Sequence, residues 1–171
     1  MNRRAVGDLA DRQLAVIRWL LTAVRDEHQV WEDWGQGDTA LFPCNVRFTA
    51  VRVPGPLVWS AAGTRDLSKA DAFLKGFFSG GGAVSLDRRQ CTYYALVPPS
   101  VKWPLAAGRD TVEMLTRSHF LGLPAVHRTE PGRGAYWSLP LEVPGGLCDV
   151  EAVAALVRLG RQAVALEEEE Q

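Results

Sequence analysis

Two short segments with a strand-like pattern constrain the fold of this 171-residue chain more than any other feature. Residues 46–53 (VRFTAVRV) and 91–98 (CTYYALVP) are rich in β-branched and aromatic side chains, which favour extended backbone. The first segment lies in an acid-free window between Asp38 and Asp66. Both segments predict strands of a sheet, and neither contains a carboxylate that could hold a metal ion.

Apolar residues at three- and four-residue steps predict three principal helices. The first begins at Asp8 as N-cap and runs unbroken to about Trp34, after which glycines follow. The second covers residues 66–78. The third follows Asp149 and is weakened by Gly160 in its interior.

The remaining expected elements are short. Residues 83–86 and 91–98 predict a hairpin, and residues 109–117 predict a short helix. Two further strands are predicted at residues 120–123 and 136–143. Residues 57–61 fit either a short strand or the start of a helix. This order predicts a single α+β domain over residues 1–166, with a mixed or antiparallel sheet flanked by N-terminal, middle and C-terminal helices. An acidic tail at residues 167–171 follows it.

Charge and hydropathy limit the classes of function. The chain has 19 basic and 20 acidic residues, a net charge of -1, so its whole surface is not built to bind nucleic acid, although a local basic patch stays open. No signal peptide and no membrane-spanning run is evident, and we expect a bacterial, cytoplasmic protein that does not enter a membrane.

The cysteines and histidines give no metal or cofactor pattern. Three cysteines, an odd number without a CxxC pair, predict reduced thiols. His119 and His127 lie eight residues apart with no acid or thiol at ligand spacing. We therefore assign no metal ligand, no cofactor and no catalytic residue.

The best candidate for ligand binding is the turn that contains Arg88 and Arg89, next to Tyr93 and Tyr94. Arginine guanidinium groups hold phosphate, and aromatic rings stack on bases. Arg128 and Arg133 join this turn only if their loop meets it in space. Trp103, in another loop, adds an aromatic contact surface. The predicted ligand-binding residues are Arg88, Arg89, Tyr93, Tyr94, Trp103, Arg128 and Arg133.

Residues 31–146 resemble the bifunctional DNA primase/polymerase (prim-pol) domains of actinobacterial plasmids and mobile elements. The resemblance rests on WEDWGQGDTALFPCNVRFTAVRVP, on SLDRRQCTYYALVPPS and on the Trp-Pro loop that follows. In that family the first block carries metal-binding acids, and the second carries a glycine-rich turn and a histidine. Here the acids are replaced by Thr49, Val51 and Val53, the histidine by Cys91, and the glycines by Arg88-Arg89.

Two-metal nucleotidyl transfer needs carboxylates, which threonine and valine cannot replace. The resemblance therefore implies a non-catalytic binding or regulatory module, linked to nucleic acid, a nucleotide or a protein partner. Two alternatives stay open. One is an enzyme that uses Cys91 with His119 or His127, and the other is an interaction domain that forms a homodimer through its first or last helix.

Overall fold

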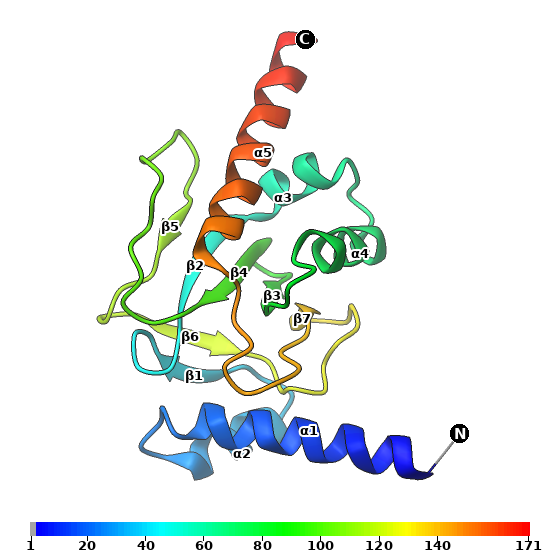
Figure 1. Cartoon of the computed structure of the whole chain (residues 1–171), viewed down its shortest axis with the longest axis vertical. Helices are drawn as coiled ribbons and strands as arrows, with labels where there is room; N and C mark the ends of the chain where they lie inside the picture. The colour runs from blue at the N-terminus through cyan, green and yellow to red at the C-terminus, as the bar shows by residue number, and fades with distance from the viewer. Residues whose placement is uncertain (1–2) are drawn as a thin grey trace.

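The computed structural model describes residues 3–171 and has an α+β architecture built around a five-stranded sheet (Figure 1). The helices are α1 (Arg3–Leu21), α2 (Glu27–Gly35), α3 (Gly55–Ala62), α4 (Leu67–Phe77) and α5 (Val150–Glu169). The strands are β1 (Ala40–Pro43), β2 (Thr49–Pro54), β3 (Val84–Asp87), β4 (Thr92–Val97), β5 (Glu113–Met114), β6 (Phe120–Leu123) and β7 (Ala135–Leu139). The predicted α+β class, with helices in the N-terminal, middle and C-terminal parts, is confirmed.

The large sheet has the strand order β5-β2-β4-β3-β7, and every neighbouring pair is antiparallel. The predicted hairpin is confirmed as β3 and β4. Strand β2 pairs with β4 from Thr49 opposite Val97 to Pro54 opposite Thr92. Strand β2 therefore pairs with β4 along its whole length and with β5 at Val51 and Arg52, and residues on both of its faces are buried.

Two hydrophobic clusters lie on opposite faces of this sheet. Ala50 of β2 belongs to the cluster that includes α1, α2 and the small sheet of β1 and β6, whereas the next residue, Val51, belongs to the cluster that includes α3, α4 and α5. Successive residues of a strand point to opposite faces, so this alternation follows directly from the pleat. Figure 1 shows the same division, with α1 and α2 at one end of the molecule and α3, α4 and α5 toward the other.

The prediction of a single long first helix is wrong. Helix α1 ends at Leu21, and α2 begins after Asp26, whose side chain accepts the backbone N–H of Gln29 at 3.2 Å. An aspartate that can cap a new helix competes with continuation of the old one, and the apolar steps run on across this break. The helix also begins at Arg3, before the predicted cap Asp8.

Strand β2 begins later than predicted. Asn45 has a φ of 62°, and its N–H donates to the carbonyl oxygen of Phe48 at 2.7 Å. Residues 45–48 therefore form a turn, and Val46 and Arg47 lie outside the strand. Residues 57–61 lie in helix α3, which settles the alternative that the sequence left open.

The predicted helix at residues 109–117 is wrong as well. Arg161 of α5 donates to both carboxylate oxygens of Asp110, at 2.8 and 3.0 Å, and the N–H of Leu115 donates to the carbonyl oxygen of Ala50 at 2.8 Å. These long-range bonds hold the segment as an irregular loop and as strand β5. The Arg161 guanidinium also holds the pKa of Asp110 below its usual range.

Helices α4 and α5 and strand β7 lie close to the predicted segments. Helix α4 lies within the predicted residues 66–78, and its N-cap is Asp66, whose side chain accepts the N–H of Lys69 at 3.0 Å. Helix α5 extends to Glu169, so most of the acidic run at residues 167–171 continues a helix whose last turns are exposed. Strand β7 ends at Leu139, before Pro140. None of the helices within residues 3–171 has the length and apolar character to cross a membrane.

Candidate functional site

The turn between β3 and β4 is held in place by Asp87. Its Oδ1 accepts the backbone N–H groups of Arg89 at 2.9 Å and of Gln90 at 3.3 Å. The Arg88 guanidinium donates to the carbonyl oxygen of Gly132 at 2.6 Å. Arg88 therefore ties this turn to the loop before β7, and the two arginine-containing loops do meet in space.

The loop of residues 124–134 is fixed from its other side by Trp137 of β7. The indole Nε1–H donates to the carbonyl oxygen of Pro124 at 3.1 Å, and the backbone N–H donates to the carbonyl oxygen of Arg128 at 2.7 Å. Since Trp137 is fully buried, this loop is anchored directly to the core.

The two loops and the connector before β1 enclose a hollow of about 250 Å³, which we call the arginine pocket. Its charged and polar lining consists of Asp38, Thr39, Asp87, Arg89, Arg128 and Arg133. A wider hollow of about 580 Å³ shares Arg128 and Arg133 with it and is also lined by His127 and Tyr136. Arg128 and Arg133 thus stand between two neighbouring depressions of one surface.

Three guanidinium groups and two carboxylates face the arginine pocket, which leaves a net charge of +1. In residues 3–171 the ion pairs Arg52–Glu113 and Arg161–Asp110 lie elsewhere, and Arg89, Arg128 and Arg133 pair with no carboxylate. Guanidinium forks form paired, charge-assisted hydrogen bonds with phosphate oxygens. The pocket is therefore suited to a small anionic group.

The connector contributes a close approach that needs glycine. Gly37 has a φ of +80°, and a Cβ atom at this position would lie 2.9 Å from an Nη atom of Arg128. The left-handed conformation and the absence of a side chain let Arg128 lie over the connector. The sequence did not identify residues 37–39 as part of the site, because they come close to the arginines only in the folded chain.

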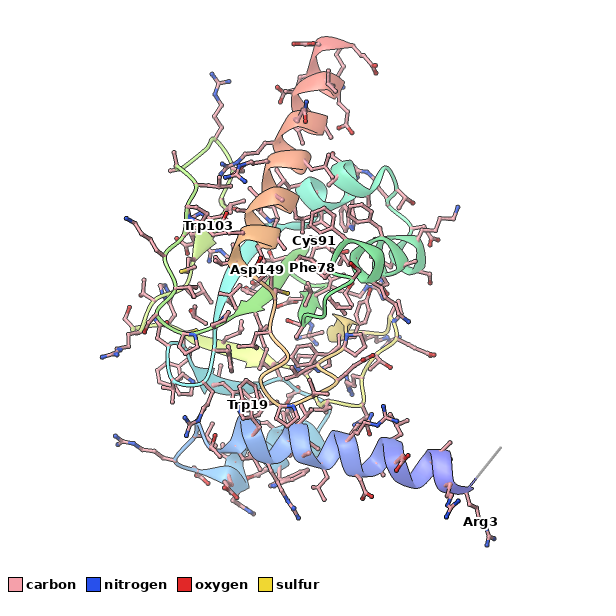
Figure 2. All side chains as sticks on the ribbon, in the orientation of Figure 1. Arg3, Trp19, Phe78, Cys91, Trp103 and Asp149 are labelled. Atoms are coloured by element: carbon pink, nitrogen blue, oxygen red, sulfur yellow. The ribbon has the colours of Figure 1, made fainter. Side chains whose placement is uncertain are left out.

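The other predicted residues point elsewhere. Tyr93 is buried on the opposite side of the sheet, where its hydroxyl accepts the Nε1–H of Trp59 at 3.0 Å and burial raises its pKa to about 12. Tyr94 is half-buried against the cluster of α1 and α2. Trp103, labelled in Figure 2, packs against the cluster that includes α5. Of the seven predicted residues, Arg89, Arg128 and Arg133 line the pocket and Arg88 joins its loops.

A second polar cluster, absent from the sequence predictions, joins α4 to β7. The Tyr136 hydroxyl donates to the carboxylate oxygens of Asp71 at 2.9 and 3.0 Å, and the Ser138 hydroxyl donates to the same carboxylate. Tyr136 and Ser138 are two residues apart in β7, so strand alternation places both on the face that α4 covers. Their common partner Asp71 lies in α4, far away in the chain, and the sequence pattern gave no sign of this contact. Burial raises the pKa of Asp71 despite these hydrogen bonds.

The raised pKa of Asp71 sets the sign of a pH effect. The folded state binds this proton more tightly than the unfolded state, so the contribution of Asp71 to stability is present at low pH and is lost as pH rises from about 3.8, its usual pKa. We expect wild type to lose stability relative to Asp71→Asn over that rise, as measured by urea denaturation at a series of pH values. A difference between the two proteins that does not change with pH contradicts this prediction.

The cysteines differ in exposure, and the structure assigns one of the histidines a local role in a turn. Cys91 is exposed at the end of the β3–β4 turn, whereas Cys44 and Cys148 are buried, and burial raises the pKa of Cys148 to about 12. His119 accepts the backbone N–H of Thr116 through Nδ1 at 2.9 Å, in the turn before β6. Within residues 3–171 no three histidine, cysteine or acidic side chains are grouped as metal ligands.

Comparison with protein-family models, with curated proteins and with solved structures found no match for this chain.

Proposed function

We propose that this chain is a non-catalytic, prim-pol-like binding or regulatory module of a bacterial mobile element, and that the arginine pocket holds the phosphate group of a single-stranded nucleic acid or a nucleotide. One observation carries the proposal: Arg89, Arg128 and Arg133 come from two separate loops, converge on one hollow, and pair with no carboxylate within residues 3–171. Unpaired guanidinium groups in a shared pocket favour phosphate as the ligand.

The environment of β2 supports the non-catalytic part of the proposal. Thr49, Val51 and Val53, which take the positions of the family's metal-binding acids, are all buried. The Thr49 hydroxyl donates to the carbonyl oxygen of Leu115 at 2.8 Å. These side chains serve packing and the contact with the residues after β5, and they offer no carboxylate to a metal ion.

The near-neutral charge of the chain supports a local rather than an extended contact. A net charge of -1 provides no general attraction for a polyanion, so binding depends on the few arginines of the pocket. We expect few phosphate contacts and therefore a shallow dependence of affinity on salt. Magnesium is expected to leave the affinity unchanged, because three arginines outnumber the two carboxylates of the pocket and no group of three metal-ligating side chains occurs within residues 3–171.

Substitution of the pocket arginines tests the proposal. A charge-assisted hydrogen bond contributes roughly 1.5–3 kcal/mol, and about 1.4 kcal/mol corresponds to tenfold in affinity. We expect the combined variant Arg89→Gln, Arg128→Gln, Arg133→Gln to weaken binding of a fluorescent single-stranded oligonucleotide by about tenfold or more, as measured by anisotropy at low salt. Arg158→Gln, an exposed arginine on α5, is the matched control and is expected to bind as wild type does.

Competition by inorganic phosphate, by a nucleoside triphosphate and by unlabelled oligonucleotide separates the sources of phosphate. Displacement by the triphosphate alone identifies a nucleotide module, and displacement by the oligonucleotide alone identifies a nucleic-acid module. The proposal is wrong if wild type binds none of these probes at low salt, or if the triple variant and Arg158→Gln bind equally well.

A further inference from the structure

We propose that this protein forms a two-fold symmetric dimer in which the N-terminal half of α1 from each copy docks into an apolar groove on the other copy. We call residues 3–12 of α1 the arm. The groove lies between α2 and the outer face of the β1–β6 sheet. This inference concerns a different surface from the arginine pocket and does not depend on the proposed ligand.

The apolar face of the arm is left mostly uncovered, with Leu9 at the edge of a hollow of about 280 Å³ whose other side includes Val126 and Leu141. In the C-terminal half of α1, Val16 and Leu20 are buried and face the core. The same face continues toward the N-terminus at helical spacing through Val6 and Leu9, yet every residue of the arm is exposed, and Leu9 is 55% exposed. Figure 1 shows α1 extending past the strands, and Figure 2 shows Arg3 at its far end.

An extended helical face of this kind is unusual without a partner. A short helical segment is only marginally stable in water, and most helices are held by tertiary packing of their apolar face. The arm has roughly ten residues and a length of about 15 Å, enough to present nearly three turns to another surface. Docking against a second surface gives this segment the packing that its own body does not provide.

The groove has the opposite shape and a matching chemistry. It encloses about 650 Å³, and its apolar lining includes Leu41, Val46 and Phe120, all of them exposed. Leu41 alternates along β1 with the buried residues Ala40 and Phe42, so it points away from the core. Phe120, which pairs with Pro43, is 63% exposed. Large apolar side chains gathered in a hollow mark a surface that another molecule covers.

Charge supports this choice of occupant. The groove is lined by Asp26 and Asp33 against Arg25, a net charge of -1, whereas the arm carries Arg3, Arg4 and Arg12 against Asp8 and Asp11, a net charge of +1. An apolar helix with a small positive excess therefore meets an apolar groove with a small negative excess. Complementary charge of this kind orients the partners more than it strengthens the complex.

The geometry excludes an intramolecular contact. The groove begins at Ala23 and Val24, beyond the C-terminal end of α1, and the arm occupies the N-terminal end of the same helix. From Leu9 to Val24 the chain advances about 20 Å along a nearly straight path, so the arm cannot fold back into its own groove. A two-fold axis lets both arms reach both grooves at once, which closes the assembly at two copies.

Analytical ultracentrifugation over a wide concentration range tests the dimer. We expect wild type to dimerise reversibly, and expect Leu9→Asp in the arm and Phe120→Asp in the groove each to raise the dissociation constant at least tenfold. Leu166→Asp is the matched control, because Leu166 is a 56% exposed leucine on α5, away from both surfaces. A monomeric wild type at every concentration overturns the proposal, as does loss of the dimer by Leu166→Asp alone.

Disulfide trapping tests the contact itself, independently of any effect of aspartate on folding. In a Cys91→Ser background, which removes the exposed native thiol, we expect a mixture of Leu9→Cys and Phe120→Cys proteins to oxidise to the mixed disulfide. Mixing Leu166→Cys with Phe120→Cys is expected to give no more than background cross-linking. If the second mixture cross-links as readily as the first, the arm is not the occupant of the groove.

Discussion

Replacing Trp137 with alanine is expected to lower the free energy of unfolding by about 3–5 kcal/mol, the usual loss for a buried tryptophan. Trp137 is fully buried, and its ring lies in the cluster formed with α1 and α2. The substitution also removes the indole donor to Pro124 and leaves that carbonyl oxygen without this partner. Urea denaturation followed by circular dichroism measures the loss.

Trp31→Ala is the control for this prediction, because it removes the same side chain from an exposed position, where Trp31 is 47% exposed. We expect it to cost much less than Trp137→Ala. A second variant, Trp137→Phe, preserves most of the volume but not the hydrogen bond to Pro124. It is expected to fold and to weaken oligonucleotide binding, because the loop that carries Arg128 and Arg133 loses an anchor. Equal costs for the two alanine variants contradict this account of the core.

Gly160→Ala is expected to destabilise the protein by about 2 kcal/mol, against the general preference of helices for alanine over glycine. A Cβ atom at Gly160 would lie 2.6 Å from the carbonyl oxygen of Leu57 and 2.8 Å from its Cγ atom. The closest obstacle is backbone, so α3 and α5 must move apart to admit one methyl group. Each lost kcal/mol lowers the melting temperature of a protein of this size by roughly 2–4 °C.

Gly76→Ala in α4 gives the opposite expectation and serves as the control, because it lies outside the arginine pocket and the proposed dimer contact. No atom lies within 4 Å of a Cβ built at Gly76, so only the helical propensity changes. We expect a gain of about 0.5–1 kcal/mol. Differential scanning calorimetry of the two variants measures both signs in one experiment. A rise in melting temperature for Gly160→Ala shows that the contact between α3 and α5 is not as close as the structure has it.

Local sequence signals were sufficient for elements whose boundaries depend on neighbouring residues. The helix at residues 66–78 and the hairpin of β3 and β4 follow from periodicity and turn residues. The break between α1 and α2 did not follow, because the apolar steps continue through it while Asp26 caps a new helix. The segment around Asp110 was also misassigned, since its conformation depends on Arg161, some fifty residues away in the chain.

The candidate site was also predicted only in part. The arginines were predicted from their residue type and from the turn that carries Arg88 and Arg89. Their convergence depends on the hydrogen bond from Arg88 to Gly132 and on the anchoring of the second loop by Trp137. The contribution of Asp38 depends on the path of the connector before β1. Aromatic neighbours in sequence were a poor guide, because Tyr93 and Tyr94 belong to opposite faces of one strand.

The sequence by itself determined the α+β class, most of the strands and helices, and the residue types available for binding, because these depend on local propensity and on periodicity. Only the tertiary structure decided which arginines share a pocket, why Gly160 is required and where apolar surface stays uncovered. These properties arise from contacts between segments far apart in the chain. Such contacts are fixed when the two cores pack on the sheet, and no local pattern of residues encodes them.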